Sequence, residues 1–212
     1  MTSNLASRLR LYLVADPEHV PGDLIEMVRS SLAGGVTAVQ LRSKNQTDRE
    51  ALILARQLRS ITANAGVLFL VNDRVDLALA SQADGVHLGV DDLPLEDARH
   101  LLGSGSIIGF SPETVDEAVD AAGRGADYLG VGPVYGTSTK ADAGDAIGLA
   151  ELHRRRILSG LPVIGIGGIT SANVRDVMDT GAAGVAVVSA ISQSHDPAFA
   201  ARTLRAAMGS LT

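Results

Sequence analysis

The sequence of 212 residues contains no cysteine, few aromatic residues and no excess of basic charge. Without cysteine, the chain has no disulfide, thiolate metal site, iron–sulfur cluster or cysteine nucleophile. Its formal net charge of -6 gives no basis for binding nucleic acid or an anionic membrane, so an anionic ligand must rely on local cations. No apolar stretch approaches the length of a membrane span, and no signal-peptide h-region precedes the first apolar run. We therefore expect a cytoplasmic protein with no nucleic-acid or membrane partner.

Glycine, in contrast, is abundant, with 23 residues, and 46% of the chain is hydrophobic. At this length one core can bury well over half of the surface that the unfolded chain exposes. The composition therefore predicts a single domain over residues 1–212. Many glycines in an apolar chain indicate tight turns, or places where the backbone closely approaches a ligand.

Eight short apolar runs rich in β-branched residues alternate with segments whose apolar residues have helical spacing. The runs are Leu11–Ala15, Val36–Leu41, Val67–Val71, Gly85–Leu88, Ser106–Phe110, Tyr128–Val131, Val163–Ile166 and Val185–Val188. Eight strand–helix units in this length predict the α/β class and a (β/α)8 TIM barrel. An open doubly wound sheet is the competing interpretation, but no Gly-x-Gly-x-x-Gly fingerprint follows the first run. In a barrel, the chemistry belongs at the carboxyl ends of the strands.

The second run continues into polar residues at alternating positions. Alternation directs Val39 and Leu41 to one face of the strand, and it directs Gln40, Arg42 and Lys44 to the other. If the apolar face meets the helices, the three polar side chains line the mouth of the barrel. Arginine offers a bidentate fork and lysine a point charge, so the group suits a polyphosphate. A solvated loop is the alternative, and for the lysine alone it is the better one.

Carboxylates follow the third and fourth runs. Asn72-Asp73 ends the third run, and Asp91 and Asp92 follow the fourth. Hard oxygen ligands without cysteine point to Mg²⁺, which takes one or two carboxylates and fills its other positions with water and substrate phosphate. Each aspartate alone could instead be a helix N-cap. His87, within the fourth run, is interpreted as a core or mouth-lining residue rather than a metal ligand.

The later units offer hydroxyl and backbone donors. The sixth run leads into a loop of small residues over 132–146 that suits a lid over an anion. Gly167-Gly168 and Val188-Ser189 follow the seventh and eighth runs, the usual phosphate site of such barrels. A side chain at position 168 is expected to occupy the space of that phosphate. The residues thus predict two anion sites, one assisted by a metal and one made largely of backbone N–H groups.

In these same segments the sequence resembles the thiamine phosphate synthase family. The resemblance runs from Tyr12-Leu13-Val14 to Val188-Ser189-Ala190-Ile191, and it includes Gln40-Leu41-Arg42-Ser43-Lys44, Asn72-Asp73, Gly109-Phe110-Ser111, Thr137-Ser138-Thr139-Lys140 and Gly165-Ile166-Gly167-Gly168-Ile169. The order of these motifs is more specific than any one of them. It implies a (β/α)8 transferase that condenses 4-amino-2-methyl-5-hydroxymethylpyrimidine diphosphate with 4-methyl-5-hydroxyethylthiazole phosphate, or its carboxylated form. The products are thiamine phosphate and diphosphate, and the implied cofactor is Mg²⁺.

Carried over position by position, the resemblance implies three groups of site residues. The pyrimidine diphosphate is expected at Gln40, Leu41, Arg42, Ser43, Lys44, Asn72, Ser111 and Lys140. The thiazole phosphate is expected at Thr137, Ser138, Thr139, Gly168, Val188 and Ser189. Asp73 and Asp92 are expected to bind Mg²⁺. Arg42, Lys44 and Lys140 are expected to be catalytic, because they would neutralise the departing diphosphate.

Three positions depart from the family pattern: Val90, Glu113 and Gly136 stand where glutamine, histidine and proline are common. Two other functions stay open. One is a thiazole tautomerase of the same superfamily, with His87 as its base, and the other is a regulatory barrel that binds phosphorylated ligands without turnover. The expected partners are two small phosphorylated substrates, and a homo-oligomeric assembly stays open.

Overall fold

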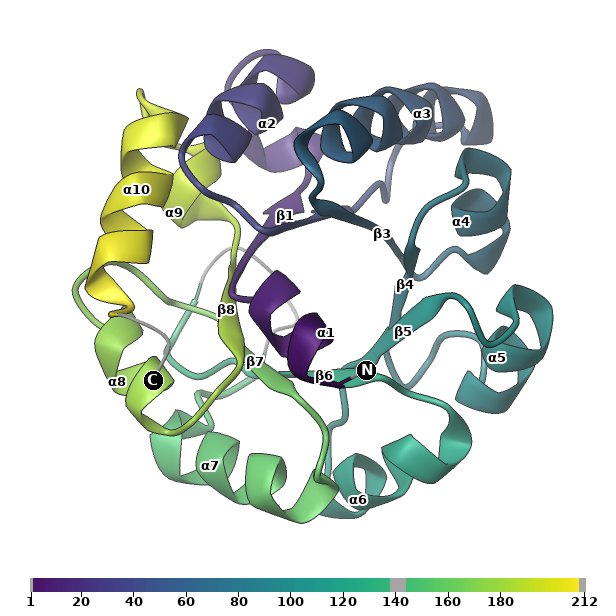
Figure 1. Cartoon of the computed structure of the whole chain (residues 1–212), viewed down its shortest axis with the longest axis vertical. Helices are drawn as coiled ribbons and strands as arrows, with labels where there is room; N and C mark the ends of the chain where they lie inside the picture. The colour runs from purple at the N-terminus through teal and green to yellow at the C-terminus, as the bar shows by residue number, and fades with distance from the viewer. Residues whose placement is uncertain (1, 138–143, 210–212) are drawn as a thin grey trace.

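The computed structural model describes residues 2–137 and 144–209 of the chain. Within them, eight parallel strands close into a barrel in chain order, and β8 pairs back with β1 (Figure 1). The strands are β1 (Leu11–Ala15), β2 (Ala38–Leu41), β3 (Leu68–Asn72), β4 (Gly85–Leu88), β5 (Ile107–Phe110), β6 (Tyr128–Val131), β7 (Val163–Ile166) and β8 (Gly184–Val187). All eight predicted strands are confirmed, with ends shifted by at most two residues. The barrel, rather than the open sheet, is the fold.

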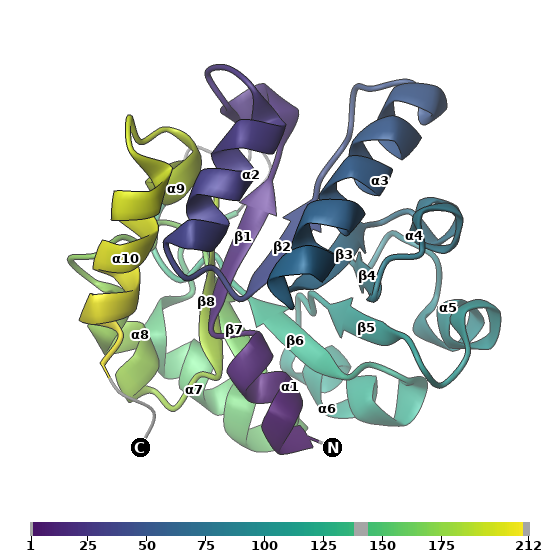
Figure 2. The same ribbon diagram turned by 45° about the horizontal axis from the view of Figure 1, so that its top comes forward.

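Helices surround the barrel on its outside, and Figure 2 shows several of them lying along the strands. They are α2 (Leu24–Ala33), α3 (Asp48–Ala65), α4 (Val75–Ser81), α5 (Leu95–Leu102), α6 (Val115–Arg124), α7 (Gly148–Ser159), α8 (Val174–Asp179), α9 (Ser189–Ser192) and α10 (Pro197–Ala207). One further helix, α1 (Thr2–Arg8), precedes β1, and a short 3-10 helix, η1 (Pro17–His19), follows β1. No helix in the described part of the chain is long and apolar enough to cross a membrane.

The helix ends follow from local sequence. The Thr47 side chain accepts a hydrogen bond from the Glu50 backbone N–H, and the Glu50 carboxylate accepts one from the Thr47 backbone N–H, so a capping box starts α3. The same helix ends at Gly66, whose φ of 67° is the left-handed conformation that glycine adopts without a Cβ clash. An equivalent capping box, built by Thr114 and Glu117, starts α6. These caps fix where each helix leaves the barrel wall.

Alternation along the strands divides the buried side chains between two cores. In β1, Leu11 and Leu13 pack outward against the helices, whereas Tyr12 and Val14 point into the barrel. Each large apolar side chain buried in this way contributes about 1.5–3 kcal/mol. The outer core therefore supplies most of the apolar burial, and the inner one determines what stands beneath the mouth.

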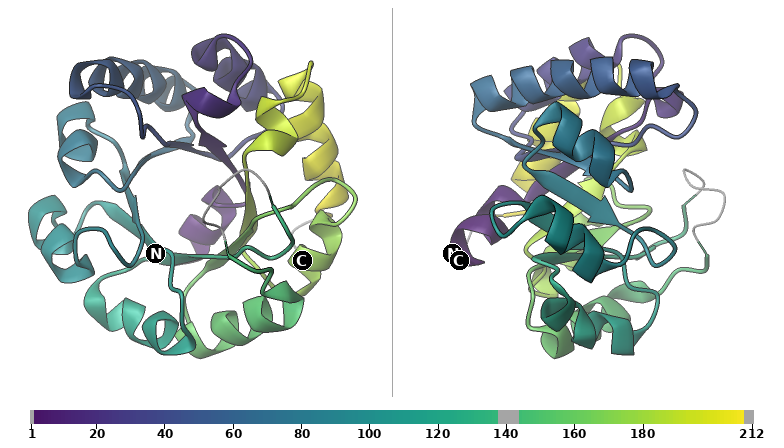
Figure 3. Two further views of the ribbon diagram at one scale, coloured as in Figure 1. Left: turned by 180° about the vertical axis from the view of Figure 1, so that it is seen from behind. Right: turned by 90° about the vertical axis from the view of Figure 1, so that its right-hand side faces the viewer.

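The N-terminal end of the barrel is closed by α1, which the sequence pattern did not predict. Leu9, just after the helix, is fully buried in the inner core, and Leu5 packs against the same cluster. Figure 3 shows α1 at one end of the barrel, and the described residues that follow β6, 132–137, lie toward the other end. The carboxyl ends of the strands are thus left as the open end.

Candidate active site

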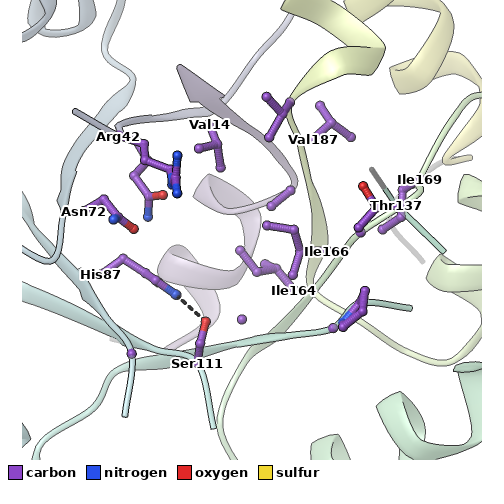
Figure 4. A pocket seen from close by; sticks show the side chains of 18 of the residues that line it. Val14, Arg42, Asn72, His87, Ser111, Thr137, Ile164, Ile166, Ile169 and Val187 are labelled. Atoms are coloured by element: carbon purple, nitrogen blue, oxygen red, sulfur yellow. Dashed lines mark hydrogen bonds between the residues drawn. The ribbon is translucent and has the colours of Figure 1, made fainter. Parts of the chain in front are cut away.

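The carboxyl ends of all eight strands surround a cavity of about 950 Å³. The predicted site residues that line it are Gln40, Arg42, Lys44, Asn72, Asp73, Asp92, Ser111, Thr137, Gly168, Val188 and Ser189. Figure 4 shows Arg42, Asn72, His87 and Ser111 on one side and Thr137 and Ile169 on the other. The apolar Ile164 and Ile166 lie between these groups in the same view. The cavity therefore has a charged side on the early strands and a side of glycines and hydroxyls on the late ones.

The alternation predicted for β2 is confirmed. Leu41 is fully buried in the outer core, whereas Gln40, Arg42 and Lys44 all line the cavity. Ser43 also points elsewhere, because its hydroxyl donates to Gln46 Oε1 at 2.8 Å. The side chains of Leu41 and Ser43 therefore do not line the cavity, since the strand pleat turns them away from it.

Both cations at the mouth have carboxylate partners. Arg42 Nη1 donates to Asp16 Oδ2 at 2.5 Å, and Lys44 Nζ forms an ion pair with Asp73 Oδ2. The carboxylate of Asp16 is only 2% exposed and also accepts from the backbone N–H of Glu18. Sequence reasoning missed Asp16, because an aspartate followed by a proline has the pattern of a turn. The pair fixes the guanidinium at the rim, where its other N–H donors remain available to a ligand.

The two aspartates predicted to bind metal lie together at this mouth. Burial raises the pKa of Asp92, and the neighbouring Asp73 carboxyl group raises it further, against the opposing effects of the Gly89 N–H and Lys44. Neither carboxylate caps a helix: Asp92 Oδ2 accepts from Gly89 N at 2.7 Å, and α4 and α5 begin without a side-chain cap. Asp73 has φ of 62°, a conformation rare outside glycine. Two acidic groups are thus held near each other at some conformational cost.

Beneath the charged side, five side chains form what we call the buried hydrogen-bond chain. Its members, in order, are Gln40, Tyr12, Tyr128, His87 and Ser111. Gln40 Nε2 donates to Tyr12 Oη at 2.9 Å, and the two tyrosine oxygens are 3.0 Å apart. His87 Nδ1 is 2.9 Å from Tyr128 Oη, and its Nε2 is 2.8 Å from Ser111 Oγ, the contact dashed in Figure 4. His87 therefore lines the mouth, one of the two places that the sequence left open for it.

The electrostatics of this chain keep its members neutral. Burial raises the pKa of Tyr12 and of Tyr128 well above the ordinary value of a phenol. Burial also lowers the pKa of His87 to about 4, against a smaller opposing effect of the Asp73 charge. Part of the imidazole surface still faces the cavity. At neutral pH the histidine is uncharged, with both ring nitrogens engaged.

Gly168, on the opposite side, has φ of +64°. A Cβ there would lie 2.5 Å from the Gly136 carbonyl oxygen and 2.8 Å from Tyr135 Cβ, so it would strike the start of the β6–α7 loop. The structure thus shows a steric obstacle within the protein, and the expected overlap with a phosphate stays a prediction. The backbone turns at this point so that the loop can pack over Gly168. At the eighth strand end, Ser189 opens the single turn of α9, and its first N–H groups have no partner within the helix.

Comparison with known proteins gives a consistent answer. A sequence profile described as thiamine monophosphate synthase matches residues 11–191. The thiamine-phosphate synthase of Desulfitobacterium hafniense is 48% identical over 195 residues, which cover 92% of this chain and 94% of that protein. The thiamine-phosphate synthase of Moorella thermoacetica is 50% identical over 181 residues, which cover 85% of this chain and 86% of that protein. Thiamine phosphate pyrophosphorylase from Pyrococcus furiosus superposes with a TM-score of 0.89 and 41% identity, over 97% of this chain and 98% of that one. The chain belongs to the thiamine-phosphate synthase family.

The chemistry follows from membership of this family. A thiamine-phosphate synthase is a transferase of thiamine biosynthesis, and the reaction is the condensation of hydroxymethylpyrimidine diphosphate with thiazole phosphate. Such a reaction needs room for two ligands and cations for the leaving diphosphate. The cavity of this synthase, with one charged side and one side of glycines and hydroxyls, has both.

Part of the predicted site of the synthase lies outside the described residues. Ser138, Thr139 and Lys140 fall between the described ranges, and so does the middle of the stretch predicted to be a lid, residues 138–143. Of the three departures from the family pattern, Val90, Glu113 and Gly136 all line the cavity. The backbone of Glu113 is held by a side chain of α7, because Arg155 Nη2 donates to the Glu113 carbonyl at 2.9 Å. Position 113 thus stays at the rim whatever side chain it carries.

Proposed function

We propose that this synthase binds the pyrimidine diphosphate on the charged side of the cavity, with one Mg²⁺, and the thiazole phosphate on the opposite side. One observation carries the proposal. Arg42, Lys44, Asp73 and Asp92 come from three neighbouring strand ends, and all of them face one cavity. Two cations and two carboxylates in one place suit a diphosphate that arrives with a divalent cation.

The two carboxylates fit a magnesium ion by their chemistry. No cluster of three or more His, Asp or Glu side chains suited to a metal occurs among residues 2–137 and 144–209. A cation would therefore be held by Asp73 and Asp92, with water and phosphate oxygens completing its shell. A positive charge would also relieve the repulsion that, together with burial, raises the pKa of Asp92. When bound, Mg²⁺ neutralises charge on the departing diphosphate.

The other residues of the charged side are assigned either to the pyrimidine ring or to the diphosphate. We assign Gln40, Asn72 and Ser111 to the pyrimidine, because an amide and a hydroxyl can pair with ring nitrogens and an amine. Arg42 and Lys44 bind the diphosphate, together with Lys140. Positive charge held at fixed points stabilises the leaving group most when the bond to the methylene has broken. The aminopyrimidine delocalises the resulting cation, so the mechanism needs no general base.

The thiazole phosphate is assigned to the other side of the cavity. Thr137 and Gly168 face it from the sixth and seventh units, and Val188 and Ser189 face it from the eighth. Backbone N–H groups at a helix start suit an anion without adding a charged side chain. Ser138 and Thr139 are assigned to this subsite by their place in the motif. Holding the two rings in line is then the main contribution of this side to the rate.

The decisive measurement is diphosphate release with both substrates present, with and without Mg²⁺. We expect release only when both substrates and the metal are supplied. Release without the metal would refute the role given to the two aspartates. Each substrate is then titrated alone: tight binding of the pyrimidine diphosphate that does not depend on Mg²⁺ would contradict the placement of the metal with this substrate. The tautomerase alternative is disfavoured, because both ring nitrogens of His87 are engaged and burial lowers its pKa to about 4.

A further inference from the structure

The buried hydrogen-bond chain ends in Gln40 and Ser111, two residues that the proposed function assigns to the pyrimidine. Its three inner members, Tyr12, Tyr128 and His87, connect these two ends. Tyr12 is 1% exposed and Tyr128 is fully buried, and among the residues that the structure describes their hydroxyl groups bond to each other and to their neighbours in the chain. Gln40 at one end and Ser111 at the other both line the cavity. A ligand in the cavity can therefore meet the ends of the chain directly.

The sequence makes room for this chain with two glycines inside the barrel. A Cβ at Gly109 would lie 2.2 Å from Tyr128 Cζ and 2.4 Å from His87 Nδ1. A Cβ at Gly130 would lie 2.9 Å from His87 Cε1 and 3.3 Å from Ser111 Oγ. Neither position tolerates a side chain while the ring of His87 stays in place. The buried hydrogen-bond chain therefore depends on the absence of a side chain at these two positions.

Counting protons limits how the chain can be arranged. It contains four hydrogen bonds, and its three inner members, two phenols and one neutral imidazole, each have one proton to give. The fourth proton must come from one end, either from the amide of Gln40 or from the hydroxyl of Ser111. If both ends donated inward, one proton would have no acceptor.

Gln40 Nε2 donates to Tyr12, which sets the direction of the whole chain. Tyr12 then donates to Tyr128, and Tyr128 donates to His87 Nδ1. The proton of the imidazole must therefore be on Nε2, from which it is donated to Ser111 Oγ. In this arrangement Gln40 keeps its Oε1 acceptor for the cavity, and Ser111 keeps its O–H donor.

We propose that the buried hydrogen-bond chain couples its two ends, so that Gln40 offers the cavity an acceptor when Ser111 offers a donor, and the reverse. This inference rests on the proposed placement of the pyrimidine. An aminopyrimidine carries a donor amine beside an acceptor ring nitrogen, so it needs one end to accept and the other to donate, whereas the corresponding 4-methoxy ring presents an acceptor at both positions and needs both ends to donate. The coupled ends accept the first and reject the second, because a buried polar group left unpaired is costly. Tyr12, Tyr128 and His87 are positioning residues that determine this specificity without contributing to the bond-breaking step.

The first test reads the direction of the chain without any substrate. The whole protein is labelled with ¹⁵N in its five histidines, and the ring signals of His87 are assigned by their loss in His87→Gln. We expect one tautomer, with Nε2 protonated. A glutamate carboxylate can only accept from Tyr12, so Gln40→Glu at pH 8 reverses every bond and moves the proton to Nδ1. If Gln40→Glu folds and the His87 signals do not change, the coupling is refuted.

A second substitution tests whether the signal travels through the tyrosines. With Tyr12→Phe, Tyr128 has only His87 to donate to, so the proton stays on Nε2 even when Gln40→Glu is added. Tyr135→Phe is the matched control, because that hydroxyl donates to the Asn173 carbonyl, outside the chain. Gln40→Glu combined with Tyr135→Phe still moves the proton to Nδ1. Transmission that survives Tyr12→Phe overturns the proposed route.

The third measurement concerns specificity. The ratio of kcat/KM for the 4-amino substrate to that for its 4-methoxy counterpart is expected to fall by about ten-fold or more in Tyr128→Phe, because the ends then turn independently. A merely structural role would lower both values by the same factor, and that result contradicts the proposal. If the wild-type protein releases no diphosphate from the amino substrate, the proposed function fails, while the tautomer measurement still decides the coupling.

Discussion

Asp16 and Arg42 form a 2.5 Å ion pair across the mouth of the barrel, joining the end of β1 to the end of β2. The carboxylate is 2% exposed and the guanidinium 23%, so the pair is anchored on the buried side and open on the other. His19 adds a third group, with its Nδ1 at 3.4 Å from Asp16 Oδ2. The position of the arginine is thus determined by a residue at the edge of the cavity whose own carboxylate is almost fully buried.

The first prediction follows from this pair. Asp16→Asn removes the charged acceptor, so Arg42 loses its fixed place and turnover falls by about ten-fold or more, the scale of a charge-assisted hydrogen bond of about 1.5–3 kcal/mol. The measurement is kcat for diphosphate release. Asp84→Asn is the control, because it breaks the 3.1 Å ion pair with Arg59, and Asp84 and Arg59 do not line the cavity. If both substitutions lower kcat equally, Asp16 acts through stability alone.

The second prediction concerns the two carboxylates. Asp73→Asn and Asp92→Asn are each expected to raise the Mg²⁺ concentration needed for half-maximal activity by about ten-fold or more, since one charged ligand is lost. Asp91→Asn serves as the control, because Asp91 also lines the cavity and stands next to one of the two carboxylates. An unchanged magnesium requirement in both test variants would exclude these residues as ligands.

A third prediction uses two glycines of nearly equal φ. Gly168 has φ of +64° and Gly160 has +65°, but only the first would bring a Cβ against another part of the chain. Both alanine substitutions are expected to destabilise the fold by roughly 1–2 kcal/mol through the backbone. Gly168→Ala should in addition displace the loop at Gly136 and weaken binding of the thiazole phosphate. Equal loss of thiazole binding in Gly160→Ala would show that the backbone strain, and not the loop contact, is responsible.

The fourth prediction is a pH dependence of stability. Burial lowers the pKa of His87 to about 4 in the folded protein, against about 6.5 for an unfolded histidine. Between these values the unfolded chain binds more protons, so the contribution of this residue is complete above pH 6.5 and is lost as the pH falls toward 4. The expected loss is about 2–3 kcal/mol. Denaturant titrations from pH 4 to pH 7 should show a shallower slope in His87→Gln, and an unchanged slope would contradict this account.

Most of the fold was predictable from the sequence, because each strand is a dense apolar run and the segments between the strands have helical periodicity. The charged side of the cavity was also predictable: alternation along β2 places Gln40, Arg42 and Lys44 on one face, and strand ends of a parallel barrel meet at one rim. These features depend on local pattern and on one rule of topology, both of which a single sequence contains.

The rest depends on distances that only barrel closure sets. Tyr12 and Tyr128 are 116 positions apart, and nothing in their local sequence indicates that their hydroxyls are 3.0 Å apart. What a Cβ at Gly168 would meet depends on where the start of the β6–α7 loop packs, and local sequence did not indicate its contact with Gly136 and Tyr135. Asp16 was missed for a different reason, since its turn-like neighbours hide a buried carboxylate. The assignment of site residues to individual substrates stays a prediction.

The two glycines inside the barrel also restrict how this enzyme can change over evolutionary time. Gly109 and Gly130 leave the space that the rings of Tyr128 and His87 fill, so each glycine is acceptable only with its large neighbour and each ring only with its glycine. Replacing one of the glycines alone would make its new side chain collide with a ring, and replacing one of the rings alone by a smaller side chain would leave a void. These four positions are therefore expected to covary: a homologue that differs at one should differ at its partner, and the single-step intermediates between the two states should be the least fit.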